Sequence, residues 1–145
     1  MAKILLVDDQ PDNLEIYRAM LEHCGYAVHL ASNGAEGVRM AMEHLPDLIV
    51  MDISMPAMDG FEATLILKSN PRTRRICIVG LTAHAMKSDR ERVLSSGFGA
   101  YLAKPLEPRL LVREVEKLLG IPLGSTYDRL RARPPSRTLG EASRR

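Results

Sequence analysis

One short stretch near the middle of the chain, Leu48-Ile49-Val50-Met51-Asp52, limits the possible folds more than any other. Bulky apolar residues follow one another without polar alternation and end abruptly in a carboxylate. An uninterrupted apolar run of this length is typical of a strand that is covered on both faces, as in a parallel sheet. Asp52 then lies where the strand leaves the sheet, and ligands of open α/β sheets bind at that carboxyl edge.

Four further apolar runs predict four more strands, which alternate along the chain with segments of helical periodicity. The predicted strands cover residues 4–7, 26–31, 48–52, 76–81 and 100–103. The predicted helices cover residues 11–24, 34–45, 60–70, 85–96 and 107–119. Pro11 suits a first helical turn, and Gly25, Gly97 and Gly120 suit the ends of helices.

This alternation of strands and helices with short connections predicts an α/β fold, a doubly wound parallel sheet of five strands with five surrounding helices. The strand order 2-1-3-4-5 is one common choice for such a sheet, and the pattern alone does not exclude 3-2-1-4-5. Helical spacing assigns a set of apolar residues to the core-facing sides of the helices: Leu14, Tyr17, Leu21, Cys24, Val38, Ala41, Met42, Leu45, Phe61, Leu65, Leu67, Leu110, Leu111, Val115, Leu118 and Leu119.

The composition excludes several classes of protein. No apolar run approaches the roughly 20 residues that span a bilayer, and Met1-Ala2-Lys3 leads directly into a strand rather than a signal peptide. We therefore expect a cytoplasmic protein without a membrane partner. Cys24 and Cys77 have no metal-ligand spacing and predict no disulfide framework. The histidines at positions 23, 29 and 44 are too isolated in the sequence to indicate a metal site.

Charge is distributed unevenly along the chain. Residues 120–145 carry six arginines against two acidic residues, a balance of +4, whereas residues 1–119 carry 14 basic and 16 acidic side chains, a balance of −2. We expect one folded domain over residues 1–120 and a basic, flexible tail over residues 121–145. Because that tail is too short for a DNA-binding output domain, a nucleic-acid partner is not expected.

Polar side chains follow four of the predicted strands. Asp8 and Asp9 come after the first strand, Asp52 ends the third, Thr82 follows the fourth and Lys104 follows the fifth. The carboxyl ends of parallel strands lie along one edge, so these side chains converge. At 4 Å and an effective dielectric constant of 20, each pair of carboxylates costs about 4 kcal/mol. Such a cluster persists if it binds a cation or shifts its protonation, and all-oxygen ligands suit Mg²⁺.

A carboxylate beside Mg²⁺, an ammonium group and a hydroxyl form a plausible phosphoryl-acceptor site. The carboxylate is the nucleophile and forms an aspartyl phosphate. The cation and the ammonium neutralise the charge on the phosphoryl oxygens, which is most of what a protein contributes to phosphoryl transfer. This chemistry makes a carboxylate of the cluster the acceptor, with Lys104 and Thr82 as its supporting groups.

At these positions the chain resembles the receiver domain of two-component response regulators, over roughly residues 2–120. The matching segments are Ile4 to Asp9, Pro46 to Asp52 with Met55-Pro56 and Met58-Asp59-Gly60, Leu81-Thr82-Ala83, and Tyr101 to Pro105. Their order and spacing make the resemblance specific. The resemblance implies the flavodoxin-like strand order 2-1-3-4-5.

The resemblance also implies individual roles. Asp52 is the phosphoacceptor, Thr82 and Lys104 complete the catalytic set, and Thr82 and Tyr101 form the switch. Mg²⁺ is held by Asp8, Asp9, Asp52 and the backbone carbonyl of Ser54. Ala83 leaves room for the phosphoryl group, and the Lys104–Pro105 peptide bond is cis.

The implied function is that of a signalling domain rather than an enzyme. A histidine kinase or a histidine phosphotransfer protein donates the phosphoryl group, and a downstream protein effector binds a surface formed by residues 85–96, 100–103 and 107–119. Single-domain regulators of the α-proteobacterial cell-division and polarity type resemble the chain as well as the receivers of hybrid histidine kinases do. A binding scaffold that never uses its phosphorylation is a further alternative, whereas a metal-dependent hydrolase would need longer loops than these.

Overall fold

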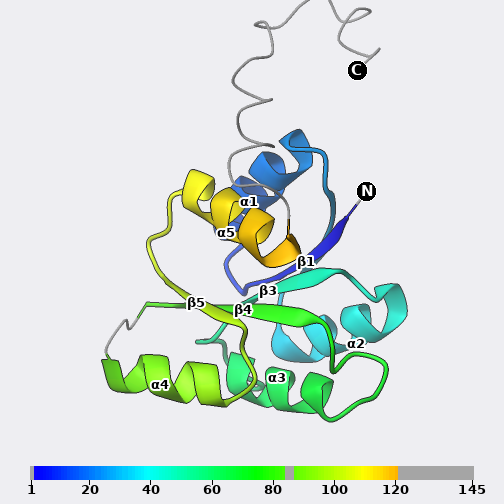
Figure 1. Cartoon of the computed structure of the whole chain (residues 1–145), viewed down its shortest axis with the longest axis vertical. Coiled ribbons are helices and arrows are strands. Elements are labelled where there is room, and N and C mark those ends of the chain that lie inside the picture. The colour runs from blue at the N-terminus through cyan, green and yellow to red at the C-terminus, as the bar shows by residue number, and fades with distance from the viewer. Residues whose placement is uncertain (1, 84–86, 121–145) are drawn as a thin grey trace, which may run out of the picture.

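The computed structural model describes residues 2–83 and 87–120, with the side chains of 87–90 excepted. Within this part of the chain five strands alternate with five helices (Figure 1). The elements are β1 (Lys3–Val7), α1 (Pro11–His23), β2 (Ala27–Ala31), α2 (Gly34–His44), β3 (Leu48–Asp52), α3 (Gly60–Lys68), β4 (Cys77–Thr82), α4 (Lys87–Ser95), β5 (Ala100–Ala103) and α5 (Pro108–Leu119). Residues 121–145, which the sequence predicts to be a flexible tail, lie outside the described residues.

All neighbouring strands pair in parallel, and the sheet has the order β2-β1-β3-β4-β5. The predicted α/β class and the order 2-1-3-4-5 are therefore confirmed, and the alternative 3-2-1-4-5 is excluded. β3 lies at the centre of the sheet, between β1 and β4. Every residue of β3 is buried, as the apolar run Leu48–Asp52 predicts.

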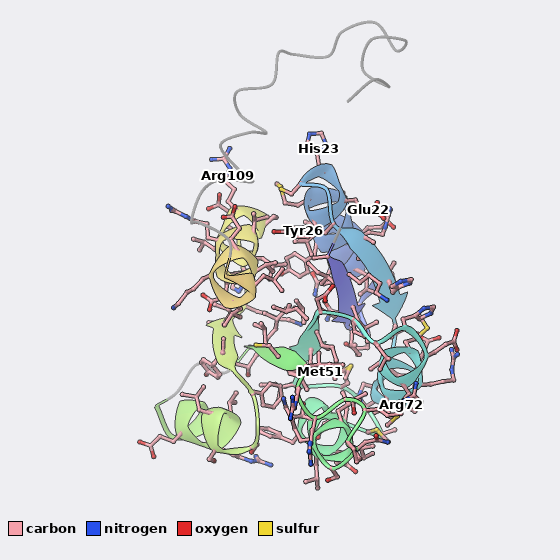
Figure 2. The ribbon with its side chains drawn as sticks, turned by 45° about the vertical axis from the view of Figure 1, so that its right-hand side comes forward. Glu22, His23, Tyr26, Met51, Arg72 and Arg109 are labelled. Atoms are coloured by element: carbon pink, nitrogen blue, oxygen red, sulfur yellow. The ribbon has the colours of Figure 1, made fainter. Side chains whose placement is uncertain are left out.

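Helices cover both faces of the sheet. In Figure 1, α1 and α5 lie above the strands, and α2, α3 and α4 lie below them. Alternate residues of the strands belong to two separate cores, because successive side chains of a strand point to opposite faces. One core joins α1 and α5 to Ile4, Leu6, Leu48, Val50, Val79 and Leu81. The other joins the remaining helices to Leu5, Val7, Ile49, Met51 and Ile78, and Figure 2 shows Met51 in this interior.

Local chemistry sets the helix ends. Pro11 occupies the first turn of α1, where its missing N–H costs nothing. The side chain of Asn33 accepts a hydrogen bond from the Glu36 amide at 2.8 Å and caps α2. Asp59 caps α3 in the same way, through the Glu62 amide at 3.0 Å. Gly120 ends α5 with a positive φ of 77°, a conformation that glycine adopts without strain.

Three predicted core residues are in fact exposed. Leu45 is 42% exposed because it is the C-cap of α2 and its left-handed φ of 47° turns it off the helix face. Leu65 is 66% exposed and Leu110 is 52% exposed. The predicted core residues Leu67, Leu111 and Val115 are buried, together with Ala63 and Thr64 of α3 and Val112 and Glu116 of α5, which were not predicted. These helices carry more apolar residues than one face can bury, so helical spacing identified part of each buried face and added residues that are exposed.

Some boundaries and one pairing also differ from the predictions. α3 ends at Lys68, two residues before the predicted end, and Ser69 is its C-cap. The predicted start of α4 at residue 85 lies outside the described residues. His29 and His44 are not isolated, because their rings stack with centroids 4.1 Å apart. No helix in the described part of the chain is long and apolar enough to cross a membrane.

Two buried threonines allow a matched test of how hydrogen bonding of a buried hydroxyl affects stability. The Thr64 hydroxyl has no hydrogen-bond partner among the described residues, whereas the Thr73 hydroxyl donates to the Leu67 carbonyl at 2.6 Å. Thr64→Val is expected to raise the free energy of unfolding by about 1 kcal/mol, because it removes an unsatisfied buried hydroxyl. Thr73→Val is expected to lower it by about 1 kcal/mol, because it removes a buried hydrogen bond and leaves the Leu67 carbonyl with only the longer one from the Asn70 amide, at 3.3 Å. Urea unfolding followed by circular dichroism measures both, and equal shifts for the two variants would contradict this account.

Candidate functional site

The strand register brings the first and third strands' acidic residues together. Val7 pairs with Met51, so Asp8 and Asp52 are each the next residue along neighbouring strands. Leu6 and Val50, two residues earlier, belong to the core under α1 and α5. Asp8 and Asp52 continue on that same face, one step beyond the apolar core. Both are buried, with 2% of their surface exposed.

Lys104 reaches this pair from the fifth strand. Its backbone amide donates to the Thr82 carbonyl at 2.8 Å, directly after β5, and the Lys104–Pro105 peptide bond is cis, as the resemblance implies. The Nζ atom of Lys104 lies 3.2 Å from Asp52 Oδ2 and 3.3 Å from Asp8 Oδ2. One ammonium group therefore contacts two carboxylates that come from the first and third strands.

Asp8 is held by the segment that follows it. Its Oδ1 atom accepts a hydrogen bond from the Gln10 amide at 2.9 Å, and its Oδ2 atom accepts one from the Asn13 side chain at 3.3 Å. Asn13 was not among the predicted site residues. The sequence did offer a signal for it: Asn13 is a side-chain amide in the first turn of the helix that directly follows Asp8 and Asp9.

The backbone around Asp52 is tightly fitted. The Ser54 amide donates to Asp52 Oδ1 at 3.2 Å, and the Gly60 amide donates to the Ile53 carbonyl at 2.9 Å. A Cβ atom on Gly60 would lie 2.7 Å from both the Asp52 carbonyl oxygen and Ile53 Cα. Only glycine permits α3 to begin this close to the backbone of Asp52, so Gly60 is a positioning residue that the site prediction omitted.

Burial and charge oppose one another at Asp52. Burial raises the pKa of the Asp52 carboxyl to about 6, and the neighbouring charge of Asp8 acts in the same direction. The Lys104 ammonium and the hydrogen bond from the Ser54 amide act against them. For Lys104, burial by itself lowers the pKa, but the attraction of Asp52 and Asp8 outweighs burial and raises it. The ammonium thus stays charged, and Asp52 is ionised at neutral pH.

The same rim has the donor set of a hard divalent cation. Oxygen atoms of Asp8, Asp9 and Asp52 all lie within 4.8 Å of one another. Asp9 is exposed, so the cluster opens to solvent on one side. One ammonium group does not offset three carboxylates, and an all-oxygen set of this charge fits Mg²⁺. The predicted use of the Ser54 carbonyl as a ligand remains a prediction.

The remaining predicted residues lie around this rim. Thr82 ends β4 and is buried, opposite Ala103 of β5. Ala83 follows it and is exposed. Tyr101 is half-buried and packs against the core beneath the sheet. The structure thus brings Asp8 and Asp52 into contact with Lys104, and places Thr82 on β4, the strand next to Asp52, and Tyr101 on β5, which pairs with β4.

Fold and rim together define a flavodoxin-like α/β protein with an acidic site at the carboxyl edge of its sheet. The family model of the response regulator receiver domain matches residues 4–116. The polar-differentiation response regulator DivK of Brucella anthropi is 37% identical over 117 residues, which are 81% of this chain and 95% of the relative. The chain belongs to the response regulator receiver domain family, whose members are signalling domains.

Solved structures of receivers agree with this assignment. The receiver domain of the sensor histidine kinase PA1611 from Pseudomonas aeruginosa, which has a magnesium ion in its active-site cleft, superposes with a TM-score of 0.76 at 39% identity. The match covers 82% of this chain and 98% of that one. The chemotaxis response regulator CheY4 of Vibrio cholerae superposes with a TM-score of 0.78 at 28% identity, over 81% and 98% of the two chains.

The raised pKa of Asp52 predicts that its charge destabilises the metal-free fold. The stabilising contribution of the neutral carboxyl is present at low pH and is lost as the pH rises from about 4 to about 6. At pH 7 without metal, Asp52→Asn is therefore expected to raise the free energy of unfolding by about 1 to 2 kcal/mol, after allowing for solvent screening at the rim. Chemical denaturation at pH 4 and pH 7 measures the difference.

The control for this experiment is Asp12→Asn, which removes an exposed acid from the first turn of α1. That variant is expected to change stability by less than about 1 kcal/mol, and in the destabilising direction, because an acid there interacts favourably with the helix dipole. Excess Mg²⁺ is expected to reverse the order of the wild type and Asp52→Asn. A metal-free Asp52→Asn protein less stable than the wild type at pH 7 would show that the Lys104 contact outweighs the cost of burial.

Proposed function

We propose that the chain is a stand-alone response regulator of a two-component phosphorelay, which accepts a phosphoryl group on Asp52. The donor is a phosphohistidine on a histidine kinase or a histidine phosphotransfer protein. The observation that carries the proposal is the position of Lys104 Nζ, within 3.3 Å of both Asp8 and Asp52 at an acidic rim. In this proposal the protein works in the cytoplasm, and its effector is another protein.

Each group at the rim has a defined task in the transfer. An Asp52 oxygen attacks phosphorus, the phosphorus–nitrogen bond of the donor breaks, and the electron pair stays on the departing imidazole. Mg²⁺, held by Asp8, Asp9, Asp52 and the Ser54 carbonyl, supplies neutralising charge to the phosphoryl oxygens when it is bound. Lys104 adds a second positive charge on the protein side, and the Thr82 hydroxyl donates to a phosphoryl oxygen. The chain thus participates in its own phosphorylation without being a classical enzyme.

Phosphorylation changes the balance between two conformations. Thr82 moves toward the phosphoryl group, and Tyr101 turns into the space that this movement leaves. Support for the coupling comes from the pairing of β4 with β5, since Gly80 pairs with Tyr101 and Thr82 with Ala103. The surface of α4, β5 and α5 then favours a different partner, which requires only a difference in affinity between the two states.

A receiver of a hybrid histidine kinase, which passes the phosphoryl group onward, is the second candidate. One observation favours it, the 39% identity to the receiver of the sensor kinase PA1611. The 37% identity to DivK supports the stand-alone reading almost equally. A phosphorylation-independent scaffold is less consistent with a site whose acids, lysine and threonine are all in place.

Labelling by a small phosphodonor tests the acceptor directly. Asp52→Asn is expected to abolish incorporation of phosphate from acetyl phosphate, because the carboxylate nucleophile is gone. The control is Asp47→Asn, an exposed acid whose side chain accepts a hydrogen bond from the Lys3 amide and which precedes β3 at the opposite edge of the sheet. Phosphate incorporation is followed by mass spectrometry of the intact protein. Stoichiometric labelling of Asp52→Asn would refute the acceptor assignment.

Titration with Mg²⁺ tests the metal assignment separately from the transfer. Asp9→Asn is expected to weaken Mg²⁺ binding by about tenfold or more, since the number of charged ligands sets the affinity of oxygen sites. Asp12→Asn, three residues along the chain and exposed, is expected to leave the affinity within about twofold. Isothermal titration calorimetry gives both values, and equal affinities for the two variants would place the cation elsewhere.

A further inference from the structure

A groove opens beside the acceptor, between α1 and the segment that joins β5 to α5. Its volume is about 600 Å³. The lining includes apolar surface from Ile16, Tyr17, Leu106 and Pro108, and polar groups from Gln10, Asn13 and Lys104. Ile16 is 52% exposed, although it is a large aliphatic residue. The groove therefore offers apolar surface that the described residues leave uncovered.

One end of this groove belongs to the phosphoacceptor rim. Lys104 and Ala83 line it, and Lys104 contacts Asp8 and Asp52. Asn13, which also lines it, holds Asp8. A chain segment in the groove would thus lie within reach of the three carboxylates, of which Asp9 is exposed. Apolar surface and negative charge occur side by side there.

The proposed function does not use the last 25 residues of the chain. They contain six arginines against Asp128 and Glu141, and apolar residues alternate with the cations in the stretch Arg129-Leu130-Arg131-Ala132-Arg133-Pro134-Pro135. Among the described residues, the one charged residue that lines the groove is Lys104. The three carboxylates of the adjoining rim lie beyond it, and Asp9 among them is exposed, so a segment of this composition matches the apolar surface of the groove and the charge of the rim next to it. The body of the chain has a charge balance of −2, opposite in sign to the +4 of this segment.

The segment is long enough to reach the groove. It begins at the end of α5, whose 12 residues span about 18 Å from Pro108, which lines the groove. The eight residues 121–128 that precede Arg129 extend up to about 27 Å, which exceeds the length of α5, so residues 129–135 can reach back to the groove. Because the segment is covalently attached, its effective concentration at the groove is on the order of millimolar, and a weak contact suffices.

We propose that residues 129–135 dock in the groove between α1 and the β5–α5 connection, and that their arginines pair with the acidic rim and slow phosphorylation of Asp52. This inference rests on the proposed function for its effect on phosphorylation. Docked arginines compete with Mg²⁺ for Asp9 and obstruct the approach of a donor. A donor must therefore displace the segment before it can phosphorylate Asp52.

Two other surfaces of the described fold suit this occupant less well. The cleft lined by Phe61, Glu62, Leu65, Arg92 and Ser96 has one acid beside one cation, and Arg92 lies 3.9 Å above the Phe61 ring. Within the described part of the chain, the rim at the end of the groove has three carboxylates around the single cation Lys104. The loop between α3 and β4 carries Arg72, Arg74 and Arg75, all exposed, and repels a basic segment. Figure 2 labels Arg72 beside α2, whose Met42 carbonyl it contacts at 3.1 Å. Charge therefore favours the acidic rim.

The test compares two full-length double variants that lose the same charge. Arg131→Gln/Arg133→Gln changes the proposed docking segment, and Arg74→Gln/Arg75→Gln changes the exposed loop. The initial rate of Asp52 labelling by acetyl phosphate is measured at low salt and at about 1 M salt, where the Debye length is about 3 Å. The docking variant is expected to react about threefold faster or more at low salt and at the wild-type rate in high salt. The loop variant is expected to keep the wild-type rate at both.

The direction of the effect makes the test sharp. Acetyl phosphate is an anion, so a general loss of positive charge would slow its approach. An unchanged or slower docking variant at low salt overturns the proposal, as does an equal acceleration of both variants. Should the wild type not be labelled at all, the proposed function fails, and docking is then decided by the amide NMR signals of Gln10, Asn13 and Leu106. Those signals are expected to shift between the wild type and the docking variant, and unchanged signals overturn the proposal.

Discussion

The ammonium group of Lys104, held between Asp8 and Asp52, is the contact on which the site depends. Oxygen atoms of these two buried carboxylates lie within 4.8 Å of each other. Two unit charges about 4 Å apart repel by about 4 kcal/mol at an effective dielectric constant of 20. Lys104 relieves part of that repulsion, at 3.2 Å from one and 3.3 Å from the other. A residual negative charge remains because Asp9 adds a third carboxylate. The rim is therefore built to receive a cation and, with it, an anionic group.

The rest of the fold supplies the rigidity that this arrangement requires. Asp8 and Asp52 each follow directly on a strand whose side chains are packed in two cores, so neither carboxylate can retreat into solvent without disturbing β1 or β3. Gly60 lets α3 start against the backbone of Asp52, and Asn13 and Gln10 hold Asp8 from the α1 side. The repelling carboxylates are thus held in place by a well-packed sheet, and in the proposed function a change in charge at the rim acts on the neighbouring strands.

The proposed conformational change is transmitted along the sheet, between strands that pair directly. Thr82 and Tyr101 belong to β4 and β5, which pair directly, and β5 leads to Lys104 within one residue. In the proposed switch, a shift at the rim reaches the surface of α4, β5 and α5 over two strands. The groove beside Lys104 extends from the segment between β5 and α5 toward α1.

The sequence by itself determined the fold class and the residues that meet at the rim, because unbroken apolar runs ending in acids have few other uses. The residues from Leu48 to Asp52, the acids after Val7 and the lysine before Pro105 all follow from the period of parallel strands. The alternation of strands and helices left two strand orders open; the family resemblance implied 2-1-3-4-5, and the strand pairing establishes it. Tertiary structure alone decided the burial of Leu67 and Leu111 rather than Leu65 and Leu110, the stacking of His29 on His44, and the close approach of Gly60 to Asp52. Each of these depends on which surfaces lie opposite one another, and spacing along a single chain does not contain that information.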